Sequence, residues 1–197
     1  VNKEYNAFLD NFGEEGNLIV VGVKDDAFFT PKAFAAWNKL MSEIKVQKEV
    51  DLVISVNDLK QLKKNDSLKT FELLPFIDTN KASNPDYLKS IQKDLFENMP
   101  FYEGLLFNKK SGSIRSAIYL DKKIVNTAHR KDYIVKDFIP KIDAFEKETG
   151  IDLRVSGMPY IRTLNALSIV NEISLFIGAS LLLTSLIFFF FFRSFRA

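Results

Sequence analysis

The closest approach to an acid–base site in this sequence is two pairs of adjacent carboxylates, Glu14-Glu15 and Asp25-Asp26. General acid–base catalysis needs titratable groups that face one reacting centre, whereas the side chains of adjacent residues point in different directions. Neither pair has a candidate base, acid or metal ligand close by in the sequence. We therefore expect solvated loops at both positions, and a catalytic pair is the alternative interpretation.

Short motifs of common catalytic and nucleotide-binding sites are missing from the chain. The sequence contains no GxSxG, no HExxH, no Walker phosphate loop and no dinucleotide fingerprint. Because no nucleophile, base and oxyanion grouping can be assembled from it, we expect no catalytic residues and no enzymatic activity.

Metal and cofactor sites are equally poorly supported. The chain has no cysteine and a single histidine, His129, which excludes a thiolate zinc site, a disulfide framework and a histidine-rich cluster. We expect His129 to be a surface residue, and we expect no cofactor and no metal. The sequence does not identify substrate-binding residues.

The charge balance argues against nucleic acid as a partner. Two of the 27 Lys and Arg residues, Arg193 and Arg196, follow an apolar tail, which leaves 25 basic against 25 acidic residues in the rest of the chain. Nucleic-acid binding usually needs a basic face, because neutralising phosphates drives the affinity. Lys63-Lys64 and Lys109-Lys110 could contact anionic headgroups, although solvated loops are the simpler interpretation.

Hydrophobic periodicity predicts a βαβ unit in the first third of the chain. Tyr5, Phe8, Leu9 and Phe12 are spaced like one face of a helix, and the β-branched run at 17–24 suits a central strand buried on both faces. Thr30-Pro31 begins a helix predicted over 31–45, and a second strand follows at 51–56. A strand, a helix and a strand in this order imply a right-handed crossover onto one sheet.

The remaining pattern predicts a second, similar unit after an insertion. Residues 59–100 are mixed and lysine-rich and contain a helix that begins at Asn84, and a hairpin follows over 104–120. An amphipathic helix is predicted over 132–148, with a bend at Pro140, and a strand over 152–156. The order predicts an α+β fold with a split βαβ, ferredoxin-like arrangement and a helical insertion. We expect this domain to occupy residues 1–157.

Residues 158–197 are predicted to form a helix that enters and spans the membrane. Residues 173–192 read ISLFIGASLLLTSLIFFFFF, about twenty residues without a charge, which is enough to span a hydrocarbon core of roughly 30 Å. A buried core helix, the alternative, should carry a polar stripe. Arg193 and Arg196 place the C-terminal end in the cytoplasm by the positive-inside rule. We therefore expect the residues before about 172 to be periplasmic in a Gram-negative cell, with the lipid bilayer of the inner membrane as a partner.

Three stretches resemble the resistance-nodulation-division (RND) superfamily of exporters, in particular its MMPL-like branch. The stretches NLIVVGVKDDAFFTPKAFAAWNKLMSEI and VDLVISVNDL are similar to the strand, turn, helix and strand that open the first periplasmic loop, and GLLFNKKSGSIRSAIYL resembles the next segment. SGMPYIRTL, the apolar run and FRSFRA resemble the start of the second transmembrane helix and the arginine-containing turn after it. The insertion at about 59–100 departs from the family pattern.

The resemblance implies that this chain is a fragment of a longer transporter, which agrees with an N-terminus at Val1 that is neither a start methionine nor a signal peptide. The parent would be a proton-driven exporter whose first periplasmic porter domain lines the path of an apolar or amphiphilic substrate. Its partners would be the remaining transmembrane helices, a second periplasmic domain and further copies in a homo-oligomer. The proton-relaying acid would lie in a helix outside this chain.

Two other function classes remain open. A tail-anchored periplasmic binding or scaffolding domain would use the apolar helix only to hold itself at the membrane. A membrane-anchored periplasmic enzyme is the third class, and it lacks a recognisable catalytic grouping.

Overall fold

The computed structural model describes residues 15–24, 26–65 and 69–192. The chain divides into two compact units with the boundary between Tyr160 and Ile161, and each is described by itself. The helix predicted around Tyr5 to Phe12, the side chains of Glu14 and Asp25, and the FRSFRA turn lie outside the described residues.

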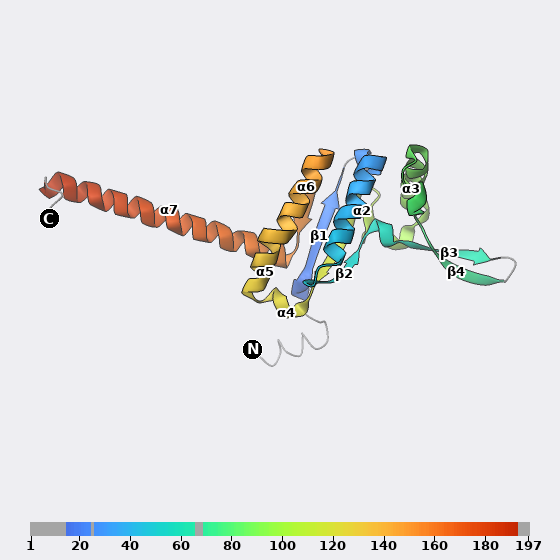
Figure 1. Cartoon of the computed structure of the whole chain (residues 1–197), viewed down its shortest axis with the longest axis horizontal. Coiled ribbons are helices and arrows are strands. Elements are labelled where there is room, and N and C mark those ends of the chain that lie inside the picture. Colours follow the sequence, from blue (N-terminus) through green and yellow to red (C-terminus); the bar gives the residue numbers. More distant parts are fainter. Residues whose placement is uncertain (1–14, 25, 66–68, 193–197) are drawn as a thin grey trace. The chain divides into compact units, whose positions relative to one another are not determined.

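The first unit is built on a mainly antiparallel sheet of strands that are distant in sequence (Figure 1). The sheet order is β2-β6-β1-β7, and the short β5 pairs with β6. Each neighbouring pair is antiparallel, with Val21 of β1 opposite Ser116 of β6 on one side and Val155 of β7 on the other. β1 and β2 are therefore parallel to each other, with β6 between them. The strands are β1 (Leu18–Val23), β2 (Val50–Ile54), β5 (Phe107–Asn108), β6 (Ser113–Leu120) and β7 (Leu153–Ser156).

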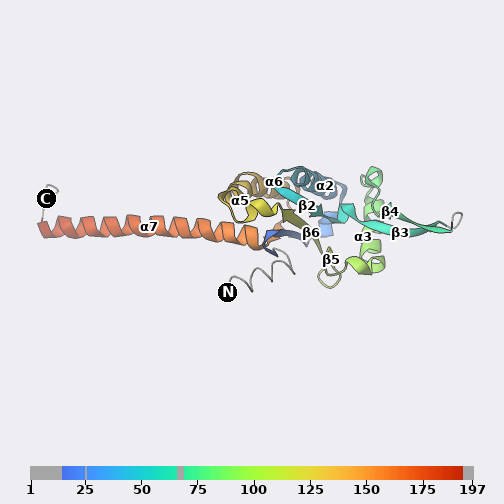
Figure 2. The same cartoon turned by 90° about the horizontal axis from the view of Figure 1, so that it is seen from below.

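Helices α2 and α6 cover one face of this sheet (Figure 2). Pro31 in the first turn of α2 supplies the fixed φ that suits a helix start, and one face of the helix is buried from Ala33 to Ile44. The helical segments of this unit, apart from those of the insertion, are η1 (Glu15–Asn17), η2 (Asp26–Phe29), α2 (Pro31–Lys45), η3 (Val56–Asp58), α4 (Lys122–Val125), α5 (Ala128–Tyr133), the π-helical η6 (Ile134–Phe138) and α6 (Ile139–Thr149). The chain is thus a mixed α+β protein.

Aromatic side chains fill the space between the helices and the sheet. Trp37 of α2 is fully buried and meets Phe28 and Phe145 edge to face, with ring centroids 5.3 and 5.9 Å apart. Its indole N–H donates to the hydroxyl of Ser55 at 3.0 Å. Buried edge-to-face rings with a satisfied polar group are a stable way to fill a core.

The two faces of the sheet differ in burial. Ile19, Val21 and Val23 of β1 are buried under the helices, whereas Leu18 and Val20 on the other face are half-buried. The prediction of a central strand is confirmed, because β1 lies between β6 and β7. The prediction of burial on both faces is wrong, because among the described residues the helices pack on one face only.

The helix predicted over 132–148 is three consecutive segments, α5, η6 and α6. Pro140 lies in the first turn of α6, directly after the π-helical η6. Just before it, the N–H of Ile139 donates to the carbonyl of Ile134, five residues back. Gly150 caps the C-terminal end of α6 in the left-handed conformation, with φ 75°.

The insertion contains a β-hairpin that its lysine-rich sequence did not indicate. β3 (Lys60–Asn65) and β4 (Thr70–Pro75) form a separate two-stranded antiparallel sheet. α3 (Pro85–Asn98) follows, capped by the Asn84 side chain and buried through Leu88, Ile91 and Leu95, as the periodicity predicts. The 3-10 turns η4 (Thr79–Lys81) and η5 (Pro100–Tyr102) flank α3.

The long helix α7 (Met158–Phe192) begins directly after β7. Gly157 joins them with φ 127°, a conformation that residues with a side chain rarely adopt. The 35 residues of α7 correspond to a length of about 52 Å, which exceeds the roughly 30 Å of a hydrocarbon core.

Candidate functional site

Of the two carboxylate pairs, the structure describes the side chain of Asp26 alone. Asp26 is exposed in η2, and no grouping of three or more His, Asp or Glu side chains that could hold a metal ion occurs among the described residues.

His129 has a partner that the sequence did not reveal. Its Nε2 lies 3.0 Å from Oε1 of Glu49, a residue 80 positions earlier whose side chain is only 11% exposed. The His129 side chain itself is about half exposed (48%). The pair ties the start of α5 to the residue before β2, which is a structural role.

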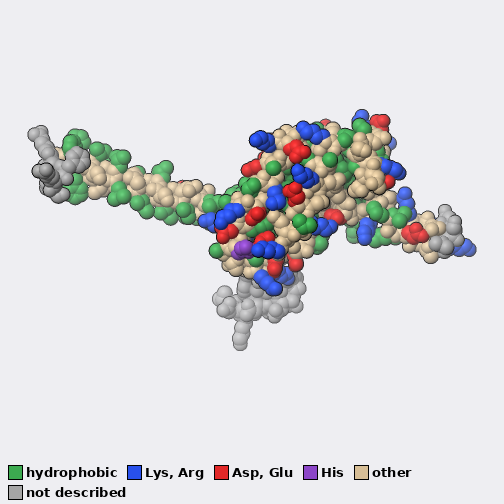
Figure 3. All heavy atoms as spheres, in the orientation of Figure 1, with side chains coloured by type: hydrophobic (Ala, Val, Ile, Leu, Met, Phe, Trp, Pro, Cys, Tyr) green, Lys and Arg blue, Asp and Glu red, His purple; other side chains and the backbone are tan. Residues whose placement is uncertain are grey.

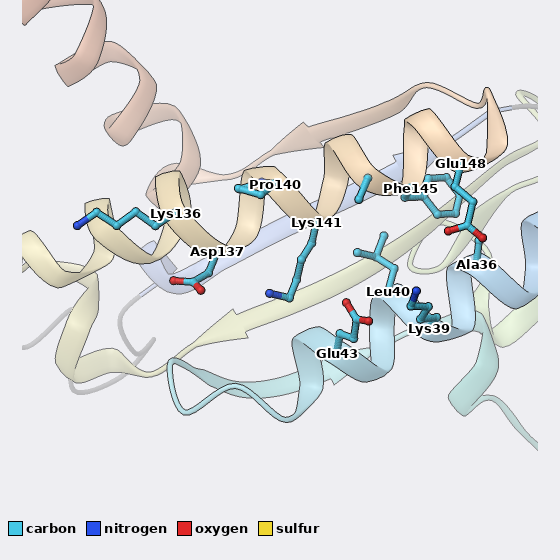
Figure 4. A pocket seen from close by; sticks show the side chains of 11 residues that line it. Ala36, Lys39, Leu40, Glu43, Lys136, Asp137, Pro140, Lys141, Phe145 and Glu148 are labelled. Carbon is cyan, nitrogen blue, oxygen red and sulfur yellow. The ribbon is translucent and has the colours of Figure 1, made fainter.

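A groove between α2 and α6 is lined by charges of both signs (Figure 4). Lys141 of α6 and Glu43 of α2 point toward one another across it, and Leu40 and Phe145 also line it. The hollow measures about 180 Å³, below the roughly 300–1,000 Å³ of typical ligand sites. Alternating charges over a buried helix contact are typical of a solvated surface, so we assign no ligand to this groove.

A larger cleft lies where the hairpin meets the end of α3. It measures about 670 Å³, which is within the range of ligand sites. One wall is β3 with Leu73 of β4, and the other is formed by η5 and the last turns of α3. Apolar and aromatic side chains share the lining with charged and amide groups: Leu62, Leu73, Phe76, Met99, Pro100, Phe101 and Tyr102, with Lys60, Gln61, Lys63, Asp94 and Asn98.

Several apolar side chains of this cleft are exposed. Leu62 is 64% and Phe101 84% exposed, and Phe71 and Leu73 on the hairpin are similarly open. The hydroxyl of Tyr102 donates to the backbone carbonyl of Lys60 at 3.2 Å and holds η5 against the hairpin. The sequence did not predict this cleft, because it forms from residues up to 42 positions apart along the chain.

The second unit has the properties of a membrane-spanning helix. α7 is long and apolar enough to cross a membrane, and its most apolar window has no burial within the described chain. Figure 3 shows hydrophobic side chains along its length. This fits a membrane-anchored protein.

Three hydroxyl groups in α7 are hydrogen-bonded within the helix itself. Ser174, Thr184 and Ser185 each donate to the carbonyl four residues earlier, at 2.9, 2.8 and 2.8 Å. A polar group that is already hydrogen-bonded is much cheaper to transfer into hydrocarbon than a free one. The hydroxyls therefore do not oppose insertion.

No protein-family model and no curated protein matches the chain.

Proposed function

We propose that this chain is part of a proton-driven exporter of the RND superfamily, MMPL-like branch. The domain would be the first periplasmic porter domain and α7 the second transmembrane helix, with the span at about 173–192 and Arg193 to Ala197 in the cytoplasm. The observation that carries the proposal is that β7 of the α+β domain continues through Gly157 into a single helix that is long and apolar enough to span a membrane.

The strand order supports a ferredoxin-like arrangement for the domain. β1-α2-β2 and β6-α5/α6-β7 are two β-α-β units, and the order β2-β6-β1-β7 interleaves their strands in one antiparallel sheet. Interleaving of this kind is what the split βαβ pattern requires. The hairpin and α3 are inserted between the two units, where the family resemblance is interrupted.

In this mechanism the domain contributes a wall of the substrate path, and the helix couples tilting of the domain to the membrane half of the transporter. The half-buried sheet face supports an apolar or amphiphilic substrate, since Leu18, Val20 and Tyr119 lie on it together with Arg115 and Arg154. Proton transfer would be the task of acidic residues in other transmembrane helices. The homo-oligomer and the second periplasmic domain would complete the path.

A tail-anchored binding or scaffolding domain is the second candidate. It is supported by the single membrane-capable helix among the described residues and by the hydrophobic core that the helices and the sheet form within the domain. In this case the helix would serve only as an anchor.

The size of the native protein in membranes tests the proposal. An antibody raised against the soluble domain should detect a product several times larger than the 22.6 kDa of this chain if the exporter proposal is correct. A native product near 22.6 kDa would overturn it in favour of the tail-anchored domain.

A further inference from the structure

We propose that the open face of the sheet, which is the face opposite α2 and α6 (Figure 2), binds an amphiphilic anion. The oxyanion head of this molecule lies over Gly22 between Arg115 and Arg154, and its apolar chain follows Val20 and Leu18. The inference rests on the proposed function only in calling the molecule a substrate. It adds the sign of the substrate's charge to that proposal.

The first argument is a glycine that the strand itself does not require. Gly22 lies in the central strand β1, and its pairing with β6 and with β7 continues on both sides without a register shift. Its φ is not positive, so backbone conformation does not explain a glycine here. A glycine inside a strand weakens it, and it often marks the close approach of a ligand. Among the described residues a Cβ at Gly22 would meet only backbone oxygens, at 3.7 and 3.8 Å, so the space above it is open.

Two arginines flank this space. Arg115 of β6 and Arg154 of β7 lie directly opposite Gly22, so the three residues share one face of the sheet. Their Cα atoms are about 10 Å apart, which is twice the spacing of neighbouring strands. A guanidinium is a planar fork that binds the oxygens of carboxylates and phosphates in pairs. Two such side chains can therefore reach one anion above Gly22.

The charges of these two arginines are not neutralised within the described part of the chain. None of the ion pairs there involves either guanidinium. Arg115 donates to the neutral carbonyl of Gly104 at 3.4 Å, a long hydrogen bond, and Arg154 is exposed. The next residues along the open face, Lys24 and Asp152, have opposite charges and balance each other. An anion is therefore the partner that matches this row.

The rest of the open face offers an apolar surface next to the arginines. Val20 lies in the row after Gly22, and Leu18 with Tyr119 lies in the row after that. Leu52 of β2 pairs with Tyr119 and is 49% exposed. The four residues from Gly22 to Leu18 extend over about 13 Å. A small inorganic anion would leave this surface in water, whereas the alkyl chain of an amphiphile would cover it.

The test uses the full chain in nanodiscs of neutral lipid and undecanoate that carries a dansyl fluorophore at the end of its chain. Binding is the rise in dansyl fluorescence over that in empty nanodiscs. We expect the acid to bind about tenfold more tightly than its methyl ester, which keeps the chain and loses the charge. Equal binding of acid and ester would overturn the proposal. Displacement of the probe by inorganic phosphate as readily as by unlabelled undecanoate would also overturn it, because a small anion would then suffice.

Two double variants separate the site from the net charge. Arg115→Gln combined with Arg154→Gln should weaken binding of the acid about tenfold and leave binding of the ester unchanged. The matched control is Lys109→Gln with Lys110→Gln, which removes the same charge from the exposed turn after β5 and should change neither affinity. Equal losses in the two double variants would reduce the effect to net charge and contradict the site.

Gly22→Val tests the space between the arginines. Its Cβ has room in the strand, and its methyl groups would occupy the position of the anionic head. We expect about tenfold weaker binding of the acid, with the wild-type fluorescence of the single Trp37 as the control for folding. Unchanged affinity in the folded variant would overturn the proposal. The ester and the arginine variants decide the question if Gly22→Val does not fold.

The site and the exporter proposal can fail separately. Acid-selective binding by a chain whose native size is near 22.6 kDa would support the site and overturn the exporter proposal. A much larger native product without acid-selective binding would support the exporter and overturn the site.

Discussion

Two serines with fully buried side chains differ in whether their hydroxyls are satisfied. Ser55 accepts the indole N–H of Trp37 at 3.0 Å, while the hydroxyl of Ser116 in β6 has no hydrogen-bond partner within the described residues. A buried polar group left without a partner costs about 1–3 kcal/mol. The same substitution should therefore have opposite effects at these two positions.

We expect Ser55→Ala to lower the free energy of unfolding by about 1–3 kcal/mol, because it leaves the Trp37 N–H unpaired. Ser116→Ala should raise the free energy of unfolding by about 1 kcal/mol, because it removes an unsatisfied hydroxyl. Urea unfolding of the full chain in mild detergent, followed by the fluorescence of the single Trp37, measures both. Destabilisation by both substitutions would show that Ser116 has a partner in solution.

Tyr133 makes the stability of the domain depend on pH. Its ring is buried and its hydroxyl donates to Oε1 of Gln47 at 2.8 Å. Burial first, and then the nearby charges of Glu49 and Asp137, raise the pKa of Tyr133 above its ordinary value of 10.0. The folded state therefore holds the phenol proton at a pH where the unfolded chain releases it.

The raised pKa of Tyr133 predicts that the folded domain loses stability at alkaline pH. Below pH 10 the folded and the unfolded chain both carry the phenol proton, and Tyr133 contributes its full stabilisation. Above pH 10 the free energy of unfolding should fall by up to about 1.4 kcal/mol per pH unit. Tyr133→Phe should show a smaller decrease between pH 9 and about 11, since lysine deprotonation acts equally on both proteins. Parallel urea titrations check this, and identical slopes would contradict it.

At the scale of elements, the junction between β7 and α7 depends on one glycine. A Cβ on Gly157 would meet the backbone of Leu18 and would lie 2.9 Å from Cα of Ile19, at a φ of 127°. Gly112 also has a positive φ, 68°, but a Cβ there would meet nothing within 4 Å. Substituting the two glycines therefore separates the cost of an unfavourable backbone φ from the cost of steric overlap between the new Cβ and β1.

Gly112→Ala should lower the free energy of unfolding by about 1–2 kcal/mol, from backbone conformation alone. Gly157→Ala should cost at least twice as much, about 3 kcal/mol or more, because β1 would also have to move. Urea unfolding followed by Trp37 fluorescence compares them. Equal costs would mean that the contact between the junction and β1 is loose.

The apolar part of α7 predicts the effect of a buried charge. Leu182→Arg should raise the free energy of membrane insertion by roughly 2.5–3.5 kcal/mol, since position 182 lies at the centre of the predicted span. Ser168→Arg, before the apolar run, is the matched control and should insert normally. A glycosylation assay for membrane integration measures both, and normal insertion of Leu182→Arg would contradict the placement of the span.

At the scale of the whole molecule, the proposed topology places the domain and the C-terminal arginines on opposite sides of the membrane. The chain has no cysteine, so any introduced cysteine is a unique label. Lys109→Cys lies in the exposed turn after β5, and Ser194→Cys lies in the FRSFRA segment outside the described residues.

An impermeant maleimide should label Lys109→Cys in cells with a permeabilised outer membrane, and it should label Ser194→Cys only after the inner membrane is broken. The reason is the positive-inside rule applied to Arg193 and Arg196. The cysteine-free parent should stay unlabelled. Labelling in the reverse order would place the domain in the cytoplasm and would contradict the proposed localisation.

The sequence by itself determined the elements with strong periodicity. The strand of β1, the helix α2 with its proline start, the inward face of α3 and the twenty uncharged residues in α7 were all predicted, because burial imposes a spacing on apolar residues wherever an element packs by itself against a core or a membrane. The α+β class followed from the order of these elements. The residues offered no catalytic grouping, and for that reason the site could not be predicted.

Only the tertiary structure decided which distant residues meet. The contact of His129 with Glu49, the hydrogen bond of Trp37 to Ser55 and the cleft beside Tyr102 join residues that no local spacing connects. The hairpin was missed because its lysines obscure the alternation of Leu62, Phe71 and Leu73. The open face of β1 was missed because a β-branched run looks the same whether one or both of its faces are covered, and the number of layers depends on contacts between elements.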